Sequence, residues 1–155
     1  MKQLAPITFW LFVCAGACSE IFAQRKAVSG AEVTGTFESY FKGKSNDNQI
    51  LIQALGRNKI KIEMNLLYQF KVNRRRIVHT GTASGEAVIQ GDSAVFTPEG
   101  VAAGDNPCKI TLKFSKPGTL IVTTENGLEC GFGLNVSADG RYKKTSGAKP
   151  KFSAN

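Results

Sequence analysis

Apolar and polar residues alternate along most of this chain. The segment NKIKIEM at 58–64 places Ile60, Ile62 and Met64 on one side, with charged residues between them. A period of two is typical of a half-buried strand, because successive side chains of a strand point to opposite faces. The segments CKITLKFS at 108–115 and CGFGLNVS at 130–137 repeat the pattern. All three segments therefore predict β-strands with one apolar face.

Turn sequences separate these segments, and SKPGT and ENGLE carry the Pro-Gly and Asn-Gly pairs of hairpin turns. No segment beyond the N-terminal region has the period of an amphipathic helix. The pattern predicts eight or nine strands, at about 32–41, 48–55, 58–66, 67–73, 80–90, 92–97, 108–115, 119–125 and 129–144, the last with a kink near Gly140. We therefore expect an all-β antiparallel meander that forms a small closed or nearly closed barrel.

The first 23 residues have the pattern of a cleaved signal peptide. Lys2 gives a basic start, LAPITFWLFVCAGAC gives an apolar stretch, and EIFAQ offers a cleavage site after Ala23. The apolar stretch is shorter than the roughly 20 residues that a spanning helix needs, so no transmembrane span is expected. The alternative is an outer-membrane lipoprotein anchored through Cys18 in AGACS, although Ala15 stands where Leu is usual.

These observations predict four parts. They are a signal peptide at 1–23, a linker at 24–31, the β-barrel domain at 32–144 and a flexible tail at 145–155. The predicted location is periplasmic or secreted. Such a chain would fold where disulfides form.

Two cysteines, Cys108 and Cys130, lie in the predicted domain, and we expect them to form a disulfide. With one strand between them, two strand spacings give about 9.6 Å, whereas a disulfide needs Cα atoms within about 7 Å. The middle strand must therefore end before the cysteines, unless a bulge brings them together. Gly131, Phe132 and Gly133 are interpreted as a barrel corner, since glycine in a strand often marks a bend or a close backbone approach.

The turn lengths also predict register. If the Lys-Pro-Gly turn connects two strands, Phe114 faces Leu120 and Leu112 faces Val122, and the next strand then pairs Val122 with Phe132 and Leu120 with Leu134. The inward positions are large, which favours a packed interior over a ligand cavity. They are Ile60, Ile62, Met64, Phe96, Leu112, Phe114, Phe132 and Leu134.

The net charge of +8 favours an anionic partner. Arg74, Arg75 and Arg76, with Lys71 nearby, form a compact basic hairpin tip, and we expect this tip to combine with the loop PEGVAAGDNP at 98–107 as a binding surface. The expected partner is an envelope or extracellular protein or an anionic polymer. Nucleic acid is not expected, because the spacing of Tyr68 and Phe70 indicates inward packing rather than stacking.

Catalytic groups are scarce. The single histidine, His79, is predicted to lie in an exposed loop and has no identifiable acid or nucleophile partner. The acids show no glycosidase-like spacing, and the glycine-rich segment near Cys130 does not open a helix that could hold a phosphate. No catalytic residue, metal site or cofactor is predicted, and the protein is expected not to be an enzyme.

The segments GEAVIQGDSAVFTPEG, CKITLKF, LIVT, CGFGLNV and GRYKK, within residues 81–144, resemble a small two-cysteine β-meander domain of bacterial exported proteins. Most such proteins have unknown function, and some are labelled lysozyme-inhibitor-like. In barrel inhibitors of c-type lysozyme a Ser-Gly segment is followed by an aromatic residue and a base, and here only Ser84 and Gly85 would correspond. The residues themselves favour a binding protein without catalysis. The resemblance adds a lysozyme inhibitor as one alternative, and the barrel fold adds a lipocalin-like carrier of a small apolar ligand as another.

Overall fold

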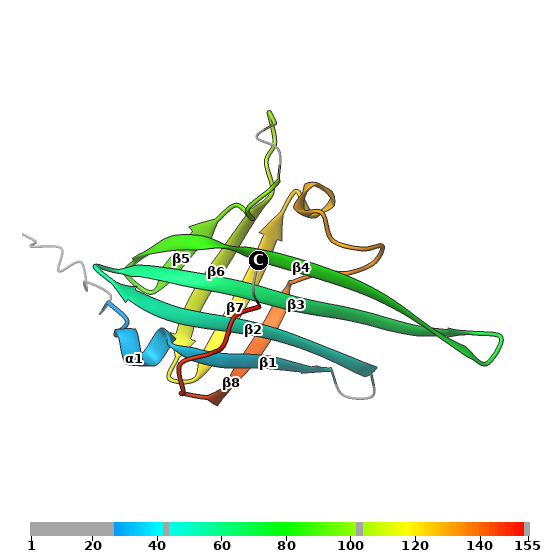
Figure 1. The fold of residues 1–155 in the computed structure, drawn as a ribbon, viewed down its shortest axis with the longest axis horizontal. Coiled ribbons are helices and arrows are strands. Elements are labelled where there is room, and N and C mark those ends of the chain that lie inside the picture. Colours follow the sequence, from blue (N-terminus) through cyan, green and yellow to red (C-terminus); the bar gives the residue numbers. More distant parts are fainter. Residues whose placement is uncertain (1–26, 42–43, 102–103, 154–155) are drawn as a thin grey trace, which may run out of the picture.

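The computed structural model describes residues 27–41, 44–101 and 104–153 (Figure 1). In this part of the chain eight strands form a closed antiparallel barrel, in which each strand pairs with the next and the last pairs with the first. This confirms the predicted all-β meander. The predicted signal peptide and the lipidation site at Cys18 lie outside the described residues. Among the described residues no helix is long and apolar enough to cross a membrane.

The element bounds show where prediction and structure differ. The segments predicted as two strands at 58–66 and 67–73 are one strand, β3. Residues 30–33, predicted as the end of the linker and the start of the first strand, form a single helical turn, α1. Ser29 and Glu32 stabilise this turn through a reciprocal capping box. The elements are α1 (Gly30–Val33), β1 (Gly35–Phe41), β2 (Lys44–Gly56), β3 (Lys59–Val72), β4 (Arg75–Gln90), β5 (Ser93–Phe96), β6 (Lys109–Lys116), β7 (Thr119–Glu125), the 3-10 helix η1 (Gly127–Cys130) and β8 (Gly140–Ser146).

The alternating apolar residues fill the barrel as their period predicts. Ile60, Ile62 and Met64 of β3 have no exposed surface. The predicted pairing of Phe114 with Leu120 is also observed, and Leu112 pairs with Val122 as expected. Strand β3 and the hairpin of β6 and β7, which are far apart in sequence, thus contribute their apolar faces to one closed core.

The final predicted strand, 129–144, is wrong over residues 129–139. β8 begins only at Gly140, and it places Tyr142 opposite Leu120, so the predicted pairs of Leu120 with Leu134 and of Val122 with Phe132 do not form. Leu134 is 72% exposed rather than inward. The left-handed backbone at Gly131 and Asn135 interrupts the extended conformation, which the alternating pattern alone does not reveal.

The C-terminal segment, predicted to be flexible, lies along the outer face of β3 (Figure 1). The carboxylate of Glu63 accepts hydrogen bonds from the backbone N–H and the hydroxyl of Ser153, at 2.8 and 3.0 Å. The ammonium of Lys61 lies 4.8 Å from the centre of the Phe152 ring. These contacts leave Glu63 only 8% exposed, although it points away from the barrel core.

Tyr142 is the largest side chain fully buried in the barrel. Its hydroxyl donates to the carbonyl of Ala138 at 2.8 Å, and the buried polar residues Ser39 and Asn48 lie beside it. Burial raises the pKa of Tyr142 to about 12, because the phenolate would lose hydration, while the neighbouring hydrogen bond with Asn48 acts in the opposite direction.

Stability should consequently fall at high pH. Since the folded-state pKa of Tyr142 lies above the unfolded value of 10.0, its contribution is complete below pH 10 and is lost as the pH rises towards 12, up to about 2 to 3 kcal/mol. Urea unfolding at increasing pH measures this loss. Tyr142→Phe should remove that part of the pH dependence, at a pH-independent cost of about 1 kcal/mol for the lost hydrogen bond. If the free energy of unfolding fell equally with rising pH in the natural protein and in Tyr142→Phe, the assignment of this loss to Tyr142 would be contradicted.

Candidate basic arm and its brace

The hairpin of β3 and β4 extends beyond the barrel as a two-stranded arm (Figure 1). The last pair between β2 and β3 joins Gln49 to Asn65, whereas β3 and β4 remain paired without a break to Val72 and Arg75. We define the arm as residues 66–81, the part of this hairpin in which β3 has no further strand partner among the described residues. The sequence analysis missed the arm because it divided β3 at Leu66, where the adjacent Leu67 interrupts the alternation, although apolar residues resume every second position from Tyr68 to Val72.

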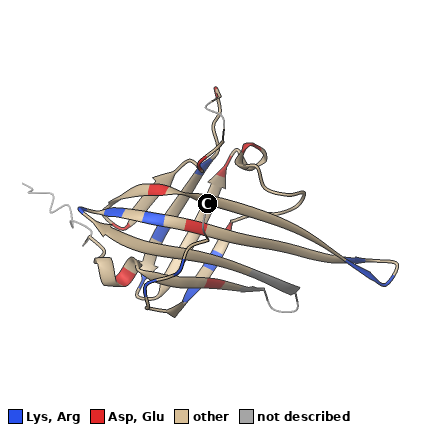
Figure 2. Cartoon of the chain, viewed as in Figure 1, with Lys and Arg blue, Asp and Glu red and all other residues tan. Residues whose placement is uncertain are grey.

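The tip of the arm carries Lys71, Arg74, Arg75 and Arg76, all exposed (Figure 2). No Asp or Glu occurs anywhere between Glu63 and Glu86 in the sequence. At the barrel end of the same two strands, by contrast, Lys59 forms a salt bridge with Glu86. The predicted basic cluster is therefore at a hairpin tip, as expected, and acidic side chains of its own hairpin do not neutralise it.

The pairing at the tip places like charges opposite each other. Lys71 faces Arg76 directly across the ladder, an arrangement that weakens a strand pair. The turn itself gives Asn73 and Arg74 φ angles of 47° and 66°, the left-handed pair that a type I′ hairpin requires and for which Asn-Gly is the preferred sequence. An arginine in this position is less favourable for folding than glycine.

Aromatic side chains occupy one face of the arm between the tip and the barrel. Tyr68, Phe70 and His79 are half-buried, and their ring centres lie 5.2 to 6.4 Å apart. They lie on the face that continues the barrel interior, because Tyr68 pairs with His79 in register with the inward residues of both strands. His79 is thus part of strand β4, and the prediction of a loop histidine is wrong.

The loop between β7 and β8 braces the base of the arm. The N–H of Gly133 donates to the carbonyl of Thr80 at 3.2 Å, and a ring nitrogen of His79 lies 2.6 Å from the carbonyl oxygen of Leu134. A side chain at Gly133 would collide with the Thr80 carbonyl, at 2.5 Å. Gly133 is therefore a position of close backbone approach, one of the roles proposed for it from the sequence, but it lies in a loop and not at a strand corner.

Two further residues complete the brace. Phe132 and Val136 pack against the barrel core from this loop. Gly81 of β4 is buried beneath them, since a Cβ there would lie 2.9 Å from Val136 and 3.1 Å from Phe132. The absence of a side chain at Gly81 thus lets the loop rest on the strand.

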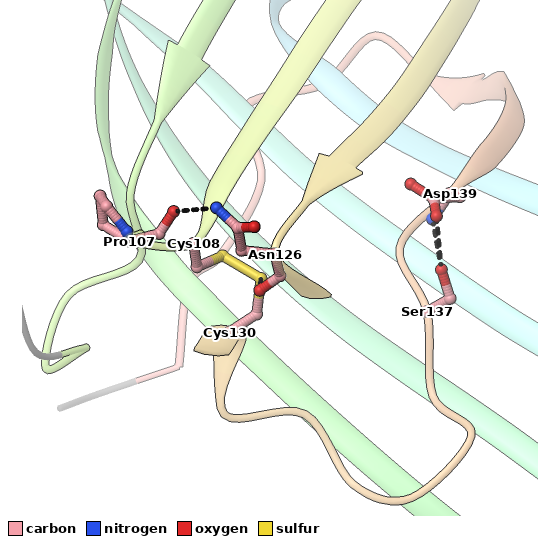
Figure 3. Close-up of a disulfide and its surroundings, with 6 residues drawn as sticks. All are labelled: Pro107, Cys108, Asn126, Cys130, Ser137 and Asp139. Atoms are coloured by element: carbon pink, nitrogen blue, oxygen red, sulfur yellow. Dashed lines mark hydrogen bonds between the residues drawn. A yellow bond between two sulfur atoms is a disulfide. The ribbon is translucent and has the colours of Figure 1, made fainter. Parts of the chain in front are cut away.

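The predicted disulfide joins Cys108 to Cys130, with 4.9 Å between the two Cα atoms (Figure 3). As the spacing argument required, the intervening strand β7 ends at Glu125, before η1 brings Cys130 back towards Cys108. The amide of Asn126 also donates to the carbonyl of Pro107 at 3.2 Å. The start of β6 and the start of the bracing loop are therefore held together.

Other predicted site residues lie elsewhere. Ser84 and Gly85 are in the middle of β4 and not in a turn, roughly 30 Å along the strand from the arm tip. Gly85 is buried, and a side chain there would meet Phe96 at 3.0 Å. The loop at 98–107 follows β5 and begins beside β4, where the N–H of Glu99 donates to the Ser84 carbonyl. Its described residues project in a different direction from the arm (Figure 1). The arm tip, the Ser-Gly pair and this loop do not form one surface.

No group of three or more His, Cys, Asp or Glu side chains in the described part of the chain is placed to hold a metal ion. A hollow of about 270 Å³ opens at the barrel end beside α1, lined in part by Phe37, Phe114 and Lys116. It lies below the usual range of roughly 300 to 1,000 Å³ for ligand pockets. A second hollow, of about 420 Å³, lies within that range and is lined in part by Lys59, Glu86 and Val95, which are exposed side chains of the barrel wall. The arm carries the predicted basic cluster, and we therefore consider it as the binding surface.

Comparisons with known proteins add no relative. Neither the family models, the curated proteins nor the solved structures include a match to this chain.

The disulfide should stabilise both the fold and the brace. Replacing Cys108 and Cys130 by serine opens a link between residues 22 apart and should lower the free energy of unfolding by about 3 kcal/mol on the chain-entropy estimate. Denaturant unfolding measures this loss, and hydrogen exchange should show faster exchange at the Gly133 amide. An unchanged unfolding midpoint would show that the link does not restrain this loop.

Proposed function

We propose that this protein is an exported binding protein that uses the arm to bind an anionic macromolecule of the envelope or extracellular space, without catalysis. The observation that carries the proposal is the uncompensated charge of the tip. Lys71 and Arg76 face each other across the ladder, and no acid occurs between residues 63 and 86. Folding alone would favour an opposite charge or a polar pair at this position.

Export is supported by two separate features. The N-terminal sequence has the pattern of a signal peptide, and the Cys108–Cys130 disulfide suits an oxidising compartment. The N–H of Val28 donates to the carbonyl of Gly91, which follows β4 at the end opposite the arm tip. The first described residues therefore lie far from the proposed binding surface.

The two alternative functions receive less support. A lipocalin-like carrier needs a cavity, whereas residues such as Ile62, Leu112 and Tyr142 fill the barrel interior without exposed surface. A lysozyme inhibitor that used Ser84 and Gly85 would need to present them on a protruding loop, and Gly85 is buried within β4.

Removing the tip charge should weaken binding to polyanions. The triple variant Arg74→Gln, Arg75→Gln and Arg76→Gln should bind dextran sulfate at least about tenfold more weakly than the natural protein, with a flatter dependence on salt, because fewer counterions are released on binding. Titration at several salt concentrations measures both quantities.

A charge-matched control separates the arm from net charge. Lys109, Lys116 and Lys143 are exposed residues of the barrel strands, and changing all three to glutamine removes the same total charge. This control should keep most of the affinity. Equal losses in the two triple variants would refute a specific role of the arm.

Two single substitutions exclude misfolding as the cause of weaker binding. Arg74→Gly supplies the turn with its preferred residue, so it should preserve stability or raise it by a few tenths of a kcal/mol while it lowers affinity. Arg57 has the same left-handed backbone, at a φ of 50°, in the β2–β3 turn at the other end of β3. Arg57→Gly therefore also removes one positive charge from a left-handed turn residue, and it should leave the affinity for dextran sulfate unchanged.

A further inference from the structure

Exposed apolar side chains accompany the basic residues of the arm. Val72 and Val78 are each 44% exposed near the tip, and Leu134 is 72% exposed in the bracing loop. Leu128, in η1 of the same loop, is 97% exposed. Such side chains in water do not contribute to folding, and exposed apolar residues on projecting segments often mark a contact surface.

Leu134 and the arm form one continuous surface. The carbonyl of Leu134 contacts the ring of His79 at 2.6 Å, and the neighbouring N–H of Gly133 donates to Thr80. The distance along β4 from His79 to Arg76 is three residues, or about 10 Å. Leu134 therefore lies beside the β4 edge of the arm, where Val78 and Arg76 point to the face opposite His79. The disulfide at Cys130 holds the loop that carries Leu134.

We infer that the anionic macromolecule bound by the arm is an anionic lipid surface. This inference rests on the proposed binding role of the arm. The arginines and Lys71 contact phosphate headgroups, while Val72, Val78 and Leu134 enter the boundary between headgroups and acyl chains. Basic residues near a membrane each add roughly 1 kcal/mol of attraction to anionic lipid, and apolar side chains gain from leaving water.

The alternatives fit the same surface less well. A soluble polyanion would pair with the arginines but would leave Leu128 and Leu134 in water. Single-stranded nucleic acid needs open aromatic faces, whereas Tyr68, Phe70 and His79 are half-buried and pack against each other. The arm is a projecting ribbon (Figure 1), and a fluid bilayer can accommodate such a shape without a complementary groove.

Vesicle flotation tests the inference with the mature protein. Vesicles of phosphatidylcholine that contain phosphatidylglycerol should bind the protein, and vesicles of phosphatidylcholine alone should bind it at least about tenfold more weakly. The double variant Val78→Ser and Leu134→Ser should lose at least about fivefold in affinity for the anionic vesicles, yet it should bind dextran sulfate like the natural protein.

The matched control removes two exposed apolar residues from the barrel wall. Leu55 and Val95 are 43% and 53% exposed, on β2 and β5, so Leu55→Ser with Val95→Ser should change neither vesicle nor dextran sulfate binding. If both double variants bind the anionic vesicles like the natural protein, or if both lose affinity equally, insertion of Val78 and Leu134 is refuted.

The remaining outcomes separate this inference from the proposed function. Binding to dextran sulfate without binding to anionic vesicles would overturn the lipid inference and leave the arm as a polyanion site. Binding to neither probe would overturn both. Binding to anionic vesicles that is weakened by the arginine variant and by the apolar double variant supports both the lipid inference and the proposed function.

Discussion

The uninterrupted pairing of β3 with β4 is the constraint on which the rest of the structure depends. All fourteen residues of β3 face a residue of β4 in a single register. Because a shift of one residue would exchange the two faces, this register places Ile60, Ile62 and Met64 in the core and fixes every side chain further along the arm. One ladder thus forms part of the barrel wall and determines how the basic tip is presented.

A two-stranded ribbon is only marginally stable alone in water, and the molecule supports this one at its base. The bracing loop pairs with Thr80, contacts His79 and rests on Gly81. The buried side chain of Asn48 adds a link from β2, since its oxygen accepts the N–H of Leu67 at 2.7 Å and its amide donates to the Ser137 carbonyl. The disulfide holds the far end of the same loop. The outermost of these contacts is at His79, so the basic tip projects beyond the brace.

The sequence predicted the fold well because the core strands alternate strictly and their turns have recognisable residues. The disulfide also followed from the sequence, together with the requirement that β7 end before Cys130. The segment 130–137 was misassigned because a loop that packs Phe132 and Val136 inward produces the same alternation as a strand. The left-handed residues at Gly131 and Asn135, which distinguish the two, leave no reliable trace in the apolar pattern.

The candidate site was predictable in part. The basic cluster was visible at once, and its place at a hairpin tip was correct. The arm was not anticipated, because its length depends on where β2 separates from β3, which involves the buried side chain of Asn48 and not local sequence preference. The same is true of Leu134, whose exposure and proximity to His79 result from long-range contacts.

The functions proposed for the arm require that β3 and β4 stay paired as far as the tip. In an antiparallel ladder, residues opposite each other in non-hydrogen-bonded pairs have closely spaced α-protons. Here these pairs are Leu67 with Thr80, Gln69 with Val78 and Lys71 with Arg76. Nuclear Overhauser spectroscopy of the protein should show an α-proton contact for each of the three. Contacts for none of them, with random-coil chemical shifts over residues 66–81, would contradict the structure of the arm and the functions proposed for it.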